Sequence, residues 1–462
     1  MLASGSAEGV CAGFRAMLSR SITALHATAL VVGIIIGASI FVQPSVITGA
    51  VPTVGGVYAV WIVSGILTLF GALIAAELAS AYPRAGGVYV FLREAFSPAV
   101  AFLWGWAMFW TMHTGIIAVI AMVFARYIAF FFPVGDAGLR LFAVAGVIVL
   151  TAVNYVGVRQ GSLVQTTLTI LKVAAIAAII VVAFVVGPRL PLNPPRLAQG
   201  VLPQPSSTPF TASQFPLAVV AGLFAFGGWH MVTYAAEETQ EPERTIPRAL
   251  WSGVLIVTAC YIALNAAYFH VLAPEQIANS SRVAADAADA VLGHGGAALM
   301  SALVVISTFG ALNGVILSGP RAYLAMARDR LLVGWAAAIH PRFRTPHRAI
   351  LLQGVWAVVL VSTGTYRALF TRVVYTEWIF FALMAAGLIR LRSRGTYNPA
   401  YRVWGYPVVP IMFVLSSAYI VVNQIIHDPK ESAVGLLLVL AGLPIYYLWL
   451  RNLSPSTAQH AD

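Results

Sequence analysis

The chain has 462 residues, of which 60% are apolar and only 9% are charged. Because about 25% of the residues in a soluble globular domain are charged, this chain carries too few charges to cover a folded surface in water. The composition therefore excludes a soluble enzyme of two or three domains and predicts a protein embedded in lipid.

Twelve apolar stretches are each long enough, at about 20 residues, to cross a hydrocarbon core of about 30 Å as a helix. Their apolar runs are continuous and lack the alternation of a barrel strand, so they predict an α-helical bundle. In chain order, the stretches are 23–48, 56–82, 99–131, 139–157, 162–187, 214–236, 248–272, 296–327, 348–364, 373–391, 406–427 and 433–451.

Lys and Arg residues are concentrated on one side of the predicted spans. The N-terminal tail and the loops after even-numbered spans hold about twice as many of the 27 Lys and Arg residues as the opposite loops. The positive-inside rule then predicts a multi-pass protein of the cell membrane with both termini in the cytoplasm. The net charge of +11 follows from arginines scattered over short loops, so we expect no nucleic-acid partner.

Cysteine usage and the N-terminal segment are also informative. Cys11 and Cys260 are the only cysteines, and no Cys/His spacing resembles a metal site. We therefore expect no disulfide, no metal and no cofactor. Residues 1–20 are polar or small, unlike a secretion signal, and we expect this segment to be retained.

Two spans are interrupted by glycines, the first within 33–44 and the sixth within 222–229. Glycine weakens a helix by about 1 kcal/mol relative to alanine, but membrane helices also use small residues for close packing. For either segment alone, both interpretations stay open. Interruptions at corresponding positions of two halves favour broken helices at the midplane site of a transporter.

Two facing breaks have a defined chemistry. The N-terminus of a half-helix attracts an anion, while free carbonyls at a helix C-terminus attract a cation, so a zwitterion fits between them. Breaks in spans 1 and 6 predict an all-α, LeuT-like five-plus-five inverted repeat with two additional C-terminal helices. The expected division is a tail at 1–22, repeats at 23–187 and 214–391, spans 11 and 12 at 406–452, and a tail at 453–462.

Four segments resemble the L-type amino acid transporter family of the amino acid, polyamine and organocation superfamily. They are 33–44, 224–229 with 237–238 and 242–249, 307–314 with 321 and 327–329, and 339–346. Their order and spacing extend the resemblance over about residues 25–450. It implies a secondary transporter of amino acids that works by alternating access.

The resemblance also implies how the substrate is held. Backbone N–H groups of Ala38 and Ser39 would bind its carboxylate, with Gly37 letting the chain turn. Its ammonium group would be held by the carbonyls of Ile35, Phe224 and Gly227. Phe224 would also close over the substrate as a gate, and Trp229 would line or brace the pocket.

The chain departs from the family pattern at two places. Ala38-Ser39 stands where the family has serine followed by glycine, which moves the hydroxyl by one position. Residues 132–136 lack the cysteine through which animal members attach to a glycoprotein, so we expect no disulfide-linked heavy chain. The expected partners are an amino acid and the lipid bilayer.

Lys172 lies about 15 Å along the fifth span from Ser162, near the bilayer centre. A lysine there costs roughly 2.5–3.5 kcal/mol, so it should face the bundle interior and have partners. In the family, a lysine at this place replaces the sodium ion of sodium-coupled relatives and touches unwound span 1 and a hydroxyl of span 8, for which Ser307 is the match. We expect sodium-independent transport, by exchange or with proton coupling.

Other polar residues give weaker predictions. Glu77 and Arg84 could close a cytoplasmic gate or be a solvated helix end. The acidic residues at 237–243 are expected to form salt bridges with nearby Arg244 and Arg248. Residues 280–293 predict an N-capped external helix, which the resemblance makes a lid.

An intramembrane enzyme and a channel are the alternatives. No nucleophile with a base or paired carboxylates is evident within the spans, and no filter motif is evident. No acidic residue is identified to meet a cationic substrate side chain, and no arginine to meet an acidic one. Together with Phe226, Trp229 and His230, this favours neutral L-amino acids.

Overall fold

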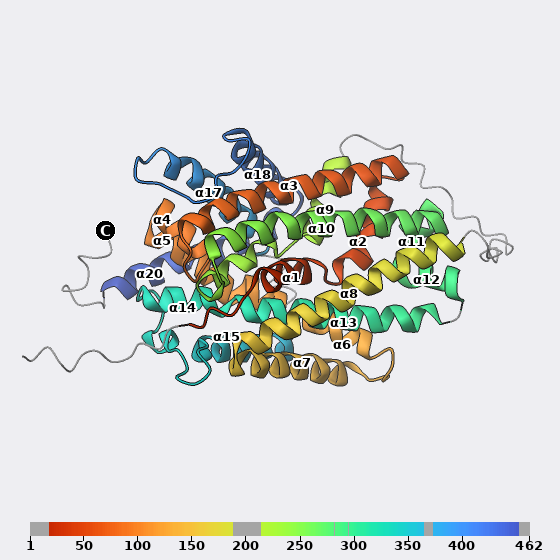
Figure 1. Ribbon diagram of the computed structural model, residues 1–462, viewed down its shortest axis with the longest axis horizontal. Coiled ribbons are helices and arrows are strands. Elements are labelled where there is room, and N and C mark those ends of the chain that lie inside the picture. The colour runs from red at the N-terminus through yellow and green to blue at the C-terminus, as the bar shows by residue number, and fades with distance from the viewer. Residues whose placement is uncertain (1–17, 188–213, 281, 294, 365–372, 452–462) are drawn as a thin grey trace, which may run out of the picture.

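The computed structural model describes residues 18–187, 214–280, 282–293, 295–364 and 373–451. Its long helices run side by side along the long axis of the molecule (Figure 1). Within these described ranges, extended backbone pairs only at an isolated bridge between Ile22 and Thr239. Cys11 and the tail at 453–462 lie outside the described residues.

The helices follow the predicted spans. The first half contains α1 (Ala24–Ile35), α2 (Ser39–Ala50), α3 (Val54–Ala81), α4 (Val88–Ala95), α5 (Pro98–Ala107), η1 (Met108–Met112), α6 (His113–Ile128), α7 (Asp136–Val156) and α8 (Val158–Val186). The second half contains α9 (Gln214–Ala225), η4 (Trp229–Glu238), α10 (Pro242–Val271), α11 (Pro274–Asn279), α12 (Val283–Leu292), α13 (Gly296–Ser318), α14 (Pro320–Arg328), η5 (Gly334–Ala337), α15 (His347–Thr363) and α17 (Thr376–Arg392). The chain continues with α18 (Val408–His427), α19 (Pro429–Leu440) and α20 (Gly442–Arg451).

In the described part of the chain, nine helices are long and apolar enough to cross a membrane, or ten when α1 and α2 count as one bent span. The two remaining predicted spans coincide with α15 and α17, which have 17 residues each. The all-helical membrane fold is therefore confirmed. The count of twelve crossings and the five-plus-five division stay predictions.

Both glycine-interrupted segments are broken. The axis bends by 47° between α1 and α2, across residues 36–38. In the second segment, α9 ends at Ala225 and the chain continues as the 3₁₀ helix η4. Gly228 has a φ of +92°, and a Cβ there would lie 2.4 Å from Cγ2 of Ile34, so this turn requires glycine.

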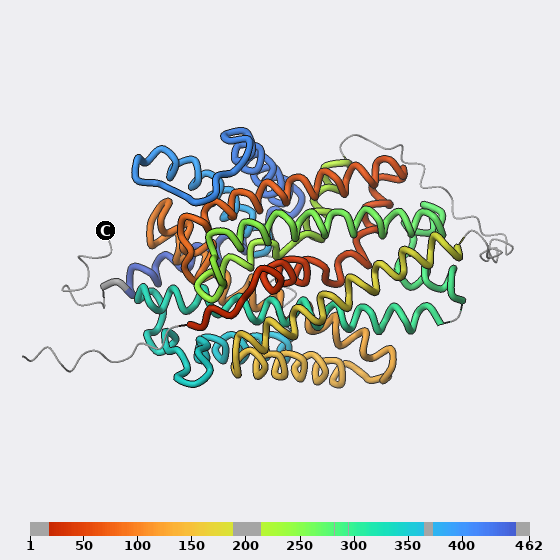
Figure 2. The backbone as a smooth tube through the Cα atoms, viewed as in Figure 1, coloured from red at the N-terminus to blue at the C-terminus, as the bar shows by residue number. Residues whose placement is uncertain are grey.

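The broken helix α1 lies in the centre of the bundle. It packs against α8, α10 and α13, while α2 packs against α9 (Figure 2). Segments far apart in the sequence therefore surround the first break, where Ile36 is fully buried.

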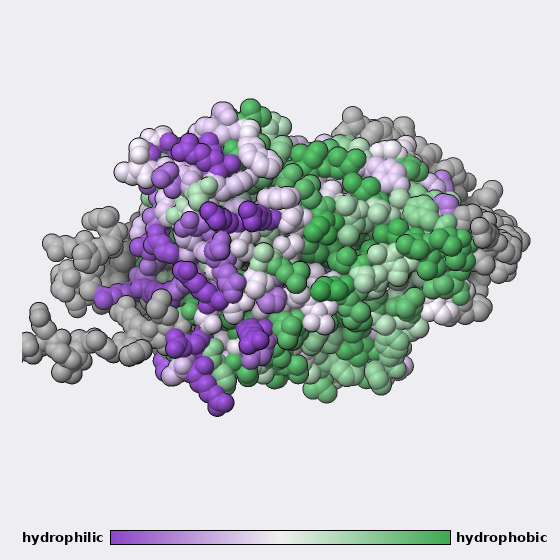
Figure 3. Space-filling model, in the orientation of Figure 1, coloured by the Kyte–Doolittle hydropathy of each residue, from purple (hydrophilic) through white to green (hydrophobic). Residues whose placement is uncertain are grey.

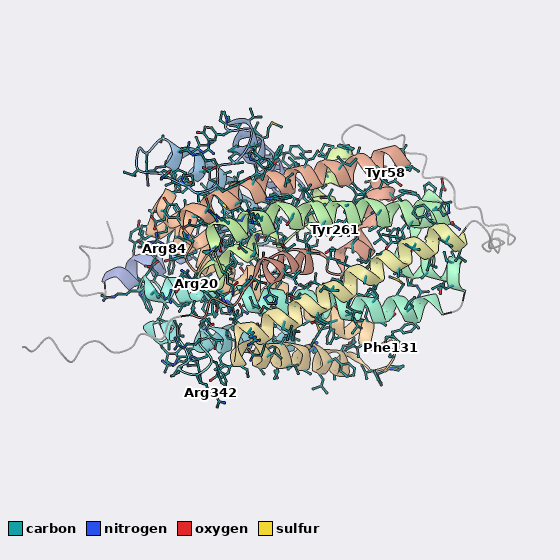
Figure 4. All side chains as sticks on the ribbon, viewed as in Figure 1. Arg20, Tyr58, Arg84, Phe131, Tyr261 and Arg342 are labelled. Carbon is teal, nitrogen blue, oxygen red and sulfur yellow. The ribbon has the colours of Figure 1, made fainter. Side chains whose placement is uncertain are left out.

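Apolar and charged residues separate along the molecule. Hydrophobic residues cover its middle, and hydrophilic residues gather at one end (Figure 3). Arg20, Arg84 and Arg342 lie at that end, whereas Phe131 lies towards the opposite one (Figure 4). The end rich in arginine is the one predicted to face the cytoplasm, and the orientation itself stays a prediction.

Candidate functional site

The two breaks face a single cavity of about 300 Å³. Parts of α6, α13 and α17 complete its wall. All seven residues predicted to bind substrate line it: Ile35, Gly37, Ala38, Ser39, Phe224, Gly227 and Trp229. Its size lies at the lower end of the range for small-molecule pockets, which suits a ligand of amino-acid size.

The N-terminus of α2 presents free donors at this cavity. Among the described residues, the backbone N–H groups of Ala38 and Ser39 have no acceptor. The Ala38 position also has no side-chain cap. Unpaired N–H groups at the start of a helix, together with its dipole, form an anion site.

Of the three carbonyls predicted to accept from the substrate ammonium group, that of Ile35 is already occupied. The Ile35 carbonyl already accepts hydrogen bonds from the Gly37 N–H at 2.8 Å and the Tyr261 hydroxyl at 3.0 Å, which occupies both of its lone pairs. Within the described ranges, the carbonyls of Ile34 and Gly227 accept no hydrogen bond, and that of Phe224 accepts one, from the Gly227 N–H. The open carbonyl at the end of α1 is thus that of Ile34.

Tyr261 was missed by the sequence reasoning. Its hydroxyl lies 3.0 Å from the carbonyl oxygens of both Ile35 and Ala225, so it bridges the last turns of α1 and α9 (Figure 4). A tyrosine in an apolar span gives no local signal of such a role, because the bridge depends on the packing of α10 against α1.

The backbone at Gly37 does not need glycine for the turn that was predicted there. Its φ lies outside the left-handed region, and an added Cβ would meet nothing closer than 3.7 Å. The turn between α1 and α2 therefore does not require glycine at this position. Gly228, in the other break, is the glycine that the backbone requires.

Phe224 and Trp229 occupy opposite environments at the cavity. Phe224 is 48% exposed, so its ring does not cover the cavity in this conformation. Trp229 is 3% exposed and packs against the ring of Phe381 at a centroid distance of 5.2 Å. Trp229 is thus a buried wall residue, which excludes an interfacial anchor.

Lys172 contacts the break in α1, at full burial. Its Nζ donates to the carbonyls of Gly33 at 2.9 Å, Ile36 at 2.8 Å and Ser307 at 2.8 Å, which uses all three ammonium protons. The Ser307 hydroxyl, predicted to touch the lysine, instead lies 3.0 Å from the Ile36 carbonyl and 3.3 Å from that of Gly37. The lysine and the serine therefore fix the same loop from two sides.

Glu77 and Arg84, which were expected to close a cytoplasmic gate or to be a solvated helix end, do not contact each other but pair with other residues. Glu77 is buried and accepts a hydrogen bond from Arg392 Nε at 2.7 Å, while Arg84 pairs with Glu94 at 3.2 Å. A solvated helix end is excluded for Glu77 by its burial. The partner from α17 was not visible locally because it is distant in sequence.

The acidic residues at the end of η4 pair with arginines more distant in the sequence than predicted. Glu238 pairs with buried Arg321 at 2.6 Å, and Glu237 with Arg328 at 2.7 Å, both on α14. Only Glu241 lies near a predicted partner, with 3.8 Å to Arg244. These pairs tie the end of the sixth segment to α14.

The predicted external helix at 280–293 forms as α12, with residue 281 outside the described ranges. Its N-cap residue is Arg282, which makes no side-chain cap hydrogen bond, so the predicted cap is wrong. The helix packs against α13 and α2. Its role as a lid stays a prediction.

Glu377 is the second residue that the sequence reasoning missed. It lies in the first turn of α17 and lines the cavity, with 16% of its side chain exposed. The argument that no acidic residue is available at the site is therefore wrong. The only sequence signal for Glu377 was an acidic residue at the start of an apolar span. A span that begins in water has the same pattern, so the sequence could not place this residue at the cavity.

Comparison with known proteins assigns the chain to a family over most of its length. Residues 22–449 match the family model described as amino acid permease. The serine/threonine exchanger SteT of Bacillus subtilis (strain 168) is 33% identical over 93% of this chain and 97% of its own length. The human cystine/glutamate transporter is 30% identical over 94% and 86%, and the mouse b(0,+)-type amino acid transporter 1 is 30% identical over 96% and 92%. The chain therefore belongs to the amino acid permease family, and it is a transporter of amino acids rather than an enzyme.

Proposed function

We propose that this permease binds one amino acid between the two breaks and exchanges it across the cell membrane by alternating access. The observation that carries the proposal is the single cavity at which both broken segments expose unpaired backbone groups. Exchange is supported by the name of the Bacillus relative, a serine/threonine exchanger.

The head of the substrate would bridge the two breaks. Its carboxylate accepts from the N–H groups of Ala38 and Ser39, and its ammonium donates to the carbonyls of Ile34, Phe224 and Gly227. The two bound groups are attached to the same α-carbon of the substrate, so substrate binding would link the motions of the two broken segments.

Transport would be independent of sodium. Lys172 supplies a fixed positive charge to three carbonyl oxygens, a donor set that otherwise suits a hard cation. An ammonium tied to α8 stays with the protein through the cycle, whereas an ion would leave with the substrate. Exchange then needs no ion gradient.

The gates would lie on opposite sides of the cavity. Phe224 would fold over the substrate from the open side. On the other side, the Glu238–Arg321 and Glu237–Arg328 pairs would hold η4 against α14. Opening towards the cytoplasm would break these two ion pairs. The whole protein would be an inverted repeat with twelve spans, and both of its termini would face the cytoplasm.

Uptake into proteoliposomes tests the proposal. A panel of radiolabelled L-amino acids is measured with empty and preloaded vesicles, with sodium or choline outside, at two external pH values. We expect saturable uptake that rises with preloading and is equal in sodium and choline. Uptake that ignores preloading would refute exchange, and non-saturable flux would indicate a channel. The protein acts without a disulfide-linked heavy chain, so the purified chain alone should suffice.

A further inference from the structure

The carboxyl group of Glu377 is the one charged side chain among the described residues that line the cavity. The polar side chains beside it are those of Ser39 and Gln43, and the rest of the wall is apolar or aromatic, including Val123, Trp378 and Phe381. The carboxyl group of Glu377 therefore faces the space that a substrate would occupy.

Buried carboxylates elsewhere in this protein are paired with arginine. Glu77 and Glu238 are both fully buried, and each accepts a hydrogen bond from an arginine Nε, at 2.7 Å and 2.6 Å respectively. Glu377 has no arginine or lysine within 4 Å among the described residues. Because an unpaired buried carboxylate costs several kcal/mol, a cationic group on the ligand would supply the partner that arginine supplies to Glu77 and Glu238.

Among the described residues, the nearest basic group makes no hydrogen bond to Glu377. The Nε2 atom of His230 lies 3.7 Å from Oε1 of Glu377, which is too far for a hydrogen bond. The His230 ring is buried between the rings of Trp104, Trp229 and Phe381. The histidine thus packs among aromatic rings and makes no hydrogen bond to the carboxyl group.

We propose that Glu377 receives the positively charged end of the substrate side chain, which makes amino acids with a cationic side chain the preferred substrates. The assignment rests on the proposed function, because it needs the head of the substrate at the breaks. The amino acid then spans the cavity from the N-terminus of α2 to the first turn of α17. Only side chains long enough to reach α17 gain from the carboxylate.

Isosteric substrate pairs test this proposal directly. L-Arginine and L-citrulline differ in charge but little in shape, as do L-lysine and L-norleucine. Uptake of each labelled compound is measured in proteoliposomes holding the full-length chain. For the wild type, we expect the charged member of each pair to have a KM lower on the order of 100-fold, as for a desolvated charge pair.

Two variants and a control sharpen the result. Glu377→Gln keeps the size and polarity of the side chain, and should lose the preference while citrulline uptake continues. Glu377→Asp should keep the preference. Glu94→Gln, which removes an exposed carboxylate at the Arg84 pair, should leave it unchanged.

The outcomes separate the two proposals. If the wild type carries citrulline and norleucine as well as their charged partners, the role of Glu377 is refuted and the proposed function stands. If Glu377→Gln keeps the preference and loses only a dependence on pH, the carboxylate carries a proton and the proposal is overturned. If no amino acid is taken up at all, the proposed function fails and this inference fails with it.

Discussion

Replacing Lys172 with methionine would test the fixed charge at the break. Methionine keeps the length of the side chain but removes three hydrogen bonds of 2.8–2.9 Å. The Ile36 carbonyl would keep the Ser307 hydroxyl. The Gly33 carbonyl would be left without a hydrogen-bond donor, because the Gly37 N–H, which would be its partner in a regular helix, donates to the Ile35 carbonyl instead.

The expected loss follows from that single orphaned group. A buried carbonyl without a donor costs about 1–3 kcal/mol, and removing a buried ammonium relieves part of this through its desolvation. We therefore expect Lys172→Met to lower the free energy of unfolding by about 1–2 kcal/mol. Transport should fall much further, because the loop that holds the substrate carboxylate loses its fixed position.

Thermal unfolding and uptake measure the two effects separately. The detergent-purified variant is melted beside the wild type, and both are assayed for exchange in proteoliposomes. Lys430→Met is the matched control, since this exposed lysine lies in the first turn of α19 and does not line the cavity. A Lys172→Met variant with wild-type exchange would refute the reasoning, and so would wild-type uptake that requires sodium.

Three further predictions concern the same structure. Gly228→Ala should lower Tm sharply or prevent folding, because it forces an L residue into a φ of +92° against Ile34, whereas Gly37→Ala should fold normally. Equal melting of these two purified variants would contradict the account of the breaks. Tyr261→Phe should cost about 1 kcal/mol in thermal unfolding and slow exchange, since the two carbonyls lose their shared donor; unchanged kinetics would exclude the bridge as a coupling element. Glu77→Gln should cost up to about 3 kcal/mol by leaving the partly buried Arg392 without its charge partner, while Arg84→Gln, at an exposed pair, should leave the melting temperature nearly unchanged.

The breaks could be predicted from the sequence because their signals are contiguous. Glycines and a proline within a short apolar run mark where a helix is weak, and the chain does break at residues 36–38. Lys172 could also be predicted to have interior partners, because a charge in mid-span has few alternatives in lipid. The family resemblance identified span 1 and Ser307, and the structure corrected which atom of Ser307 takes part.

The partners of most other polar residues could not be predicted. Arg84 is close to Glu77 in sequence, yet the structure selects Arg392 from α17. Proximity along the chain says little in a bundle, because each helix meets neighbours from distant parts of the sequence. Ile35 was likewise predicted as a free acceptor, and only the packing of α10 shows that Tyr261 occupies it.

The sequence by itself determined that the chain lies in lipid, that it is helical, and where its first and sixth segments come apart. Composition and glycine placement carry this information because the backbone in lipid has to satisfy its own hydrogen bonds. Only the tertiary structure decided which face of each helix meets the cavity, and hence that Glu377 lies in its wall. The physical reason is that lipid and the bundle interior are equally apolar, so hydropathy does not distinguish a helix face turned inward from one turned outward.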